Sequence, residues 1–131
     1  MVCYNIVKRG GIILDIILTI LGILIVIFFM LASLNGVKKY VKSPLITTIA
    51  KQHRIFGMLA TFTALIHMLI AVIDGELRIT GTLALISLIV TGMMGMMFSK
   101  EKKKALYIAH RIIGPVTFIL IIIHIILNST T

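Results

Sequence analysis

The stretch HRIFG at residues 53–57, followed by a second histidine at His67, recurs as HRIIG at residues 110–114, followed by His124. These two copies contain all four histidines of the 131-residue chain. Histidines fourteen positions apart lie within roughly 40° of the same side of an α-helix and about 21 Å apart along its axis. Each copy therefore predicts a helix with two histidines on one face.

Both copies lie in strongly apolar surroundings. Four runs without Asp, Glu, Lys or Arg each have about the length of a membrane-spanning helix. In lipid the backbone must satisfy its own hydrogen bonds, and these runs are too long for barrel strands. With 60% hydrophobic residues and short connections, we predict an all-α integral membrane protein, a four-transmembrane-helix up-down bundle. We expect one domain over residues 1–131, with helices at about 11–35, 44–74, 79–98 and 101–128.

The single cysteine, Cys3, excludes a disulfide framework and the covalent attachment of c-type haem. The apolar run that follows Lys8 and Arg9 is too long for the hydrophobic part of a signal peptide. We therefore expect this run to be retained as the first membrane helix.

The net charge of +9 is unevenly distributed. Most basic residues lie in or beside the connections after the first and third expected helices. They are Lys38, Lys39, Lys42, Lys51, Arg54, Lys100, Lys102, Lys103, Lys104 and Arg111. The positive-inside rule places these loops in the cytoplasm and both termini outside, in a multi-pass protein of the cell membrane. Topology and attraction to anionic membrane lipid explain the charge, so we predict no nucleic-acid partner.

The histidines predict cofactor binding. The second and fourth helices are separated by one complete span and therefore run in the same direction. We therefore expect His53 to meet His110 near the cytoplasmic face. His67 is expected to meet His124 toward the outer face. An ionisable ring inside a membrane helix marks function by default. Because haem iron accepts an imidazole on each axial face, the two pairs predict two haem b groups with six-coordinate iron.

Residues beside the first histidine of each copy support this prediction. Gly57 and Gly114 lie one turn deeper on the same face and would leave room for the macrocycle; close helix packing is the alternative explanation. Arg54 and Arg111, with Lys51, are candidates to pair the propionates of the cytoplasmic haem, or they mark the membrane interface. Candidates for the outer propionates are Lys8, Arg9, Arg78, Asn128, Ser129 and Thr130.

The doubled histidine spacing resembles the diheme membrane cytochrome b superfamily. In the four-helix core of the cytochrome b subunit of quinol:cytochrome c oxidoreductases, two parallel helices each carry two histidines with thirteen residues between them. The HRI-X-G opening is also similar to the ferric reductase and NADPH oxidase transmembrane domain. The resemblance implies that His53 and His110 are the cytoplasmic ligands and His67 and His124 the outer ligands. The chain lacks the Pro-Glu-Trp-Tyr motif of the quinol site.

The expected function is transfer of single electrons across the membrane between a cytoplasmic-side and an outer-side haem. The redox partner would be a flavoprotein, an iron-sulfur subunit or a quinone. The chain would act as an electron-transfer protein or as a subunit of a membrane oxidoreductase. It would function alone, as a homo-oligomer or within a complex. Two alternatives stay open. One is a haem-bearing membrane anchor or quinone-reactive subunit of a larger oxidoreductase, and the other is a histidine-lined metal or proton transporter, with Asp15 as a proton site.

Overall fold

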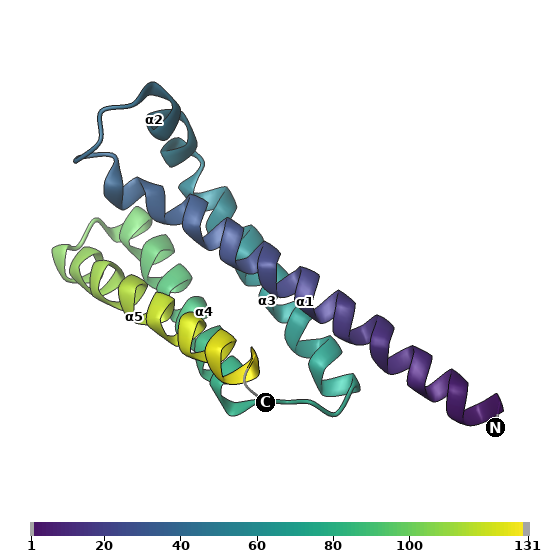
Figure 1. Cartoon of the computed structure of the whole chain (residues 1–131). Helices are drawn as coiled ribbons and strands as arrows, with labels where there is room; N and C mark the ends of the chain where they lie inside the picture. Colours follow the sequence, from purple (N-terminus) through teal and green to yellow (C-terminus); the bar gives the residue numbers. More distant parts are fainter. Residues whose placement is uncertain (1, 130–131) are drawn as a thin grey trace. The chain divides into compact units, whose positions relative to one another are not determined.

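The computed structural model describes residues 2–129, with side chains for residues 11–129. Within that range all regular structure is helical: α1 (Val2–Val37), α2 (Pro44–Lys51), α3 (His53–Ile73), α4 (Ile79–Glu101) and α5 (Lys104–Ser129) (Figure 1). Four of these helices, all but α2, are long and apolar enough to cross a membrane. The prediction of an all-α, multi-pass membrane protein with four spanning helices is confirmed.

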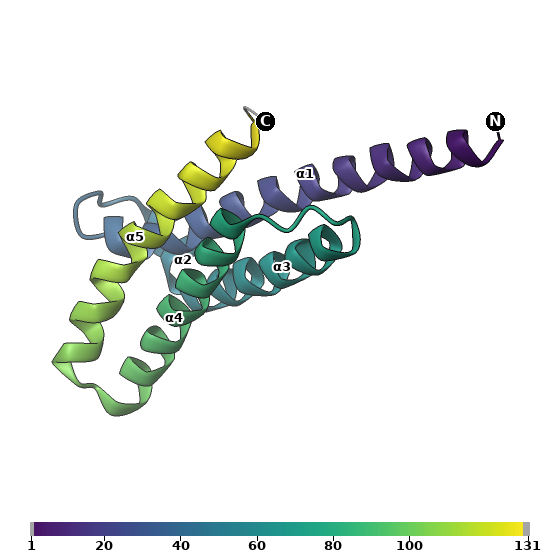
Figure 2. The ribbon, with the colours of Figure 1, turned by 90° about the horizontal axis from the view of Figure 1, so that it is seen from below.

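The chain divides into two compact units, residues 1–77 and residues 78–131. In the first unit α1 packs along α3, and the short helix α2 packs against α1. In the second unit α4 packs along α5, and Figure 2 shows these two helices joined by a short turn. Each unit is thus a helical hairpin that contains one copy of the histidine repeat.

The buried residues of the two hairpins are mainly small. Ala32, Ala60, Ala64 and Ala84 are among the buried residues, whereas many Ile, Leu, Phe and Met side chains of the spans are exposed. Small residues let helix backbones approach closely, and exposed large apolar side chains suit a surface that faces acyl chains rather than water. The spanning helices therefore contact membrane lipid along much of their length.

The helix expected over residues 44–74 is interrupted. Pro44 is the first residue of α2, as predicted, with Ser43 extended before it, but Gln52 has φ −89° and ψ 8° and separates α2 from α3. Its carbonyl accepts from the backbone N–H of Ile55 and of Phe56 and so begins a second helix. The interruption lies where polar Lys51 and Gln52 end the amphipathic segment and the apolar span begins, so α3 starts at His53.

The other helix boundaries also differ from those expected from the charge-free runs. α1 begins at Val2 rather than near residue 11. Gly10 and Gly11 lie inside the helix, although each glycine costs about 1 kcal/mol of helix stability relative to alanine. It passes Asn35 and Gly36 and ends at Val37. α4 continues to Glu101, where Lys102 adopts a left-handed conformation (φ 54°) as the helix cap, and α5 begins at Lys104. The side chains of Lys8 and Arg9, and Thr130, lie outside the described residues.

Candidate functional site

Both histidines of α3 face α1. Nδ1 of His53 lies 2.7 Å from the carbonyl oxygen of Ala32, and because a carbonyl only accepts, Nδ1 donates. The backbone of Leu18 is a hydrogen-bond partner of the His67 ring. As the chain advances from His53 to His67 on α3, its partner residue on α1 falls from 32 to 18, so the two helices are antiparallel. The prediction that the two histidines share one helix face is confirmed for this copy.

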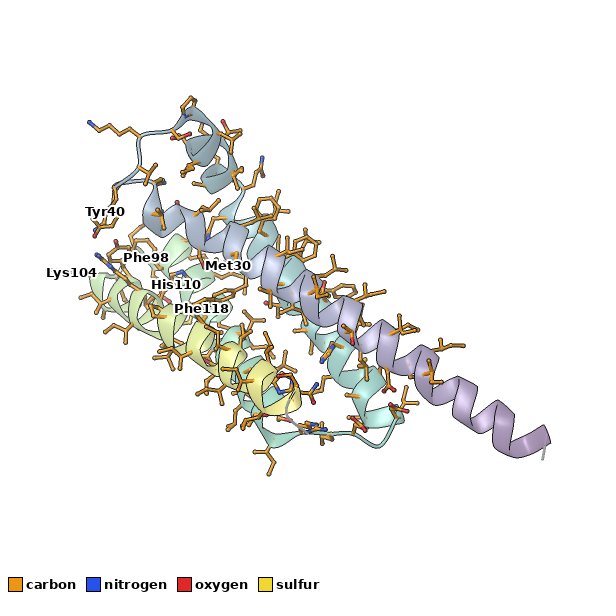
Figure 3. All side chains as sticks on the ribbon, in the orientation of Figure 1. Met30, Tyr40, Phe98, Lys104, His110 and Phe118 are labelled. Atoms are coloured by element: carbon orange, nitrogen blue, oxygen red, sulfur yellow. The ribbon has the colours of Figure 1, made fainter. Side chains whose placement is uncertain are left out.

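The second copy repeats the arrangement against α4. Nδ1 of His110, labelled in Figure 3, donates to the carbonyl oxygen of Thr91 at 2.8 Å. Nδ1 of His124 lies 3.0 Å from Oγ1 of Thr80. The partner number again falls as the histidine number rises, and α4 and α5 are antiparallel. All four histidines are half-buried, so each ring lies partly between the helices of its own hairpin.

Glycines on α1 and α4 accompany these contacts. A methyl group in place of the Gly81 hydrogen would lie 2.9 Å from Cε1 of His124, and one on Gly95 would lie 3.2 Å from Cε1 of His110. On α1, a methyl group on Gly22 would lie 3.9 Å from Cε1 of His67. The rings of α5 therefore occupy space that a side chain on α4 would need.

The glycines also follow a rule of register. Each carbonyl that a histidine reaches belongs to the residue four positions before a glycine: Leu18 before Gly22, Ala32 before Gly36 and Thr91 before Gly95. A helical side chain covers the turn on the N-terminal side of its own Cα, which is the turn that holds this carbonyl. At Gly95 the missing side chain leaves that turn bare, so the His110 ring can reach its carbonyl oxygen, whereas a methyl group on Gly36 would meet no described atom within 4 Å.

None of these glycines was among the predicted site residues, although their spacing in the sequence could have identified them. Gly22 and Gly36 are fourteen positions apart, as are Gly81 and Gly95, and this matches the spacing of the histidines on the facing helix. Single glycines are common in membrane helices, so only the shared spacing distinguishes them from general packing residues. The internal repeat therefore extends over both helices of each hairpin.

The residues predicted beside the histidines lie in open positions. A methyl group on Gly57 or Gly114 would meet no described atom within 4 Å, which is compatible with space for a bulky group one turn from His53 and His110. Arg54 and Arg111 are exposed. Their assignment to haem clearance and to the propionates stays a prediction, as does that of Arg78, Asn128 and Ser129.

A hydroxyl cluster in the second unit was not predicted from the sequence. Oγ1 of Thr117, which is fully buried, lies 2.7 Å from Oγ of Ser87 and 3.0 Å from Oγ1 of Thr91. It lies midway along α5 between the two histidines and joins α5 to α4. The equivalent position of the first copy is Ala60, which is also fully buried. The two hairpins thus share the contact of their first histidine with a backbone carbonyl but differ at their centres.

The ring contacts fit histidines that could hold a metal. A histidine that binds metal through one ring nitrogen commonly donates its other N–H to a carbonyl or hydroxyl, which fixes the ring and its tautomer. The Nδ1 contacts of His53, His110 and His124 are compatible with this form, in which Nε2 would be the nitrogen free for a metal. Among residues 11–129, no group of three or more His, Cys, Asp or Glu side chains is placed to hold a bare metal ion.

Comparisons with protein-family models, with curated proteins and with solved structures find no match to this chain.

Proposed function

We propose that the protein is a minimal diheme b-type cytochrome that carries single electrons across the membrane. His53 and His110 hold one haem, and His67 and His124 hold the other. The observation that supports this most is the anchoring of the imidazoles, since Nδ1 of His53 and of His110 each donates to a carbonyl oxygen of the neighbouring helix. Imidazoles fixed in this way are oriented to bind iron through Nε2.

The pairing follows from the order of the helices. A chain that crosses the membrane four times enters α3 and α5 from the same side, so the first histidine of each lies near one surface and the second lies deeper. Two histidines are sufficient for each haem, because the macrocycle supplies the remaining iron ligands. The diheme membrane cytochromes that the sequence resembles combine their histidines in this way.

Haem, when bound, supplies reversible one-electron chemistry at iron. The residues of the chain do the rest: the carbonyls of Ala32 and Thr91 hold the rings of His53 and His110, and Gly95 leaves room for the His110 ring. Arg54 and Arg111 are proposed to pair the propionates at the first site. The lipid-facing apolar side chains exclude water from both sites and so limit side reactions.

We place the lysine-rich loops in the cytoplasm and both termini outside, because basic residues are retained on the cytoplasmic side. The exposed lysines then attract an acidic redox partner, either a flavoprotein or an iron-sulfur subunit, while a quinone in the lipid is the third candidate.

The test is a dithionite-reduced minus oxidised visible spectrum of the purified protein, with haem counted per chain. Two b-type haems are expected. His67→Ala and His124→Ala should each remove the same haem and spare the one removed by His53→Ala or His110→Ala. If His67→Ala and His110→Ala removed the same haem, the pairing would be wrong. A colourless protein from haem-replete cells would exclude the cytochrome and favour a histidine-lined metal or proton transporter.

Co-purification with soluble subunits distinguishes a haem-bearing anchor subunit from a cytochrome that functions alone. An anchor co-purifies with soluble subunits, and its deletion releases them from the membrane. A cytochrome that functions alone keeps its haems and its electron transfer between added donor and acceptor when purified as a single chain in liposomes.

A further inference from the structure

His124 differs from the other histidines in the position of its hydrogen-bond partner relative to the facing glycine. The residue four positions before Gly81 is Leu77, which precedes α4, since that helix begins at Ile79. Leu77 is therefore outside the regular helix that supplies the carbonyl acceptor at the other glycines. At this position Oγ1 of Thr80 lies 3.0 Å from Nδ1 of His124. A side-chain hydroxyl thus takes the place that a helix carbonyl has at the His53 and His110 sites.

We propose that Thr80 is a positioning residue for His124, and that its hydroxyl sets the redox potential of the haem that His124 binds separately from that of the other haem. This inference rests on the proposed haem function. It concerns the one histidine whose Nδ1 partner a point substitution can remove, because the carbonyls of Ala32 and Thr91 belong to the backbone.

The chemistry of the imidazole fixes the direction of this hydrogen bond. When Nε2 of a neutral histidine is a metal ligand, the ring proton is on Nδ1, so Nδ1 donates and Oγ1 of Thr80 accepts. Donation from Nδ1 increases the electron density on the ring and stabilises the oxidised iron. Loss of the acceptor therefore raises the reduction potential of that iron.

A neighbouring residue on α4 provides a matched control. Oγ1 of Thr82 donates to the carbonyl oxygen of Arg78 at 3.3 Å, within its own helix, so Thr82→Val removes a hydroxyl two positions away without changing a histidine contact.

The experiment is a potentiometric titration of the two haems in Thr80→Val, Thr80→Ser and Thr82→Val, with haem counted per chain. In Thr80→Val the haem that is lost in His124→Ala should shift to higher potential, with the ratio of reduced to oxidised haem at the original midpoint changed severalfold. A tenfold change corresponds to about 59 mV for one electron. Haem affinity at this site should fall about tenfold, the lower end of the usual effect of such a loss.

The outcomes separate this inference from the function on which it rests. A shift restricted to one haem, restored in Thr80→Ser and absent from Thr82→Val, supports the role of the hydroxyl. Unchanged potential and affinity in Thr80→Val, or an equal shift of both haems, overturns it while two bound haems uphold the cytochrome. Failure of the unsubstituted protein to bind haem overturns both. If Thr80→Val does not fold, Thr80→Ala and Thr80→Ser give the same comparison.

Discussion

At the residue scale, the glycines that face three of the four histidines predict a graded set of substitutions. Gly81→Ala would place a methyl group 2.9 Å from His124, Gly95→Ala would place one 3.2 Å from His110, and Gly22→Ala would place one 3.9 Å from His67. Only the last is an ordinary van der Waals distance. We expect Gly81→Ala to displace the His124 ring and lose its haem, Gly95→Ala to weaken the His110 site, and Gly22→Ala to be tolerated.

The added methyl group overpacks the space between the helices, and overpacking typically lowers the free energy of unfolding by about 1–3 kcal/mol. The number of haems per chain and the thermal unfolding temperature in detergent measure the loss of haem and of stability. Gly92→Ala is the control, because it lies on the same helix as Gly81 and its methyl group would meet no described atom within 4 Å. Equal effects of Gly81→Ala and Gly92→Ala would show that the ring is free to move and that the contact is unimportant.

At the scale of elements, the hydroxyl cluster distinguishes the α4–α5 hairpin. Thr117→Val keeps the shape of the side chain but removes its contacts with Ser87 and Thr91. Such interhelical hydrogen bonds average about 0.6 kcal/mol in membrane proteins, so we expect a loss of about 1 kcal/mol in unfolding free energy with both haems retained. Denaturation in mixed detergent micelles measures this loss.

The control for the cluster is Thr61→Val on α3. Oγ1 of Thr61 donates to the carbonyl oxygen of Gly57 within its own helix at 2.9 Å. Its removal leaves the contact between helices unchanged, so the variant should unfold like the unsubstituted protein. If Thr117→Val were no less stable than Thr61→Val, the cluster would contribute nothing to the association of α4 with α5.

Elements also show how far the sequence alone could predict the structure. The charge-free runs located all four spans, because lipid imposes both their length and their composition. The break at Gln52 was missed because polar residues such as Lys51 and Gln52 also occur inside continuous helices, so they do not show that one helix ends and another begins. The fourteen-residue spacing put both histidines of each copy on one face, but it did not identify the facing residue. Thr80 could not be found without knowing where α4 begins.

At the scale of the whole molecule, the distribution of lysines predicts the orientation in the membrane. Tyr40 and Leu77 are exposed residues in the connections after α1 and after α3, which lie on opposite sides of a membrane that both helices cross. In a Cys3→Ser background, Leu77→Cys should react with an impermeant maleimide in intact cells. Tyr40→Cys should react only after permeabilisation, because its connection carries Lys38, Lys39 and Lys42.

The connection between α4 and α5 provides an independent check on this orientation. Glu101→Cys lies among four lysines and should share the labelling behaviour of Tyr40→Cys, since two spans, α3 and α4, separate the two positions. Reactivity of Glu101→Cys together with Leu77→Cys would mean that one helix does not cross the membrane. The inverted pattern, with only Tyr40→Cys and Glu101→Cys reactive from outside, would place the His53 and His110 site at the outer surface. Electrons from a cytoplasmic donor would then enter at His67 and His124, next to Thr80, rather than beside Arg54 and Arg111.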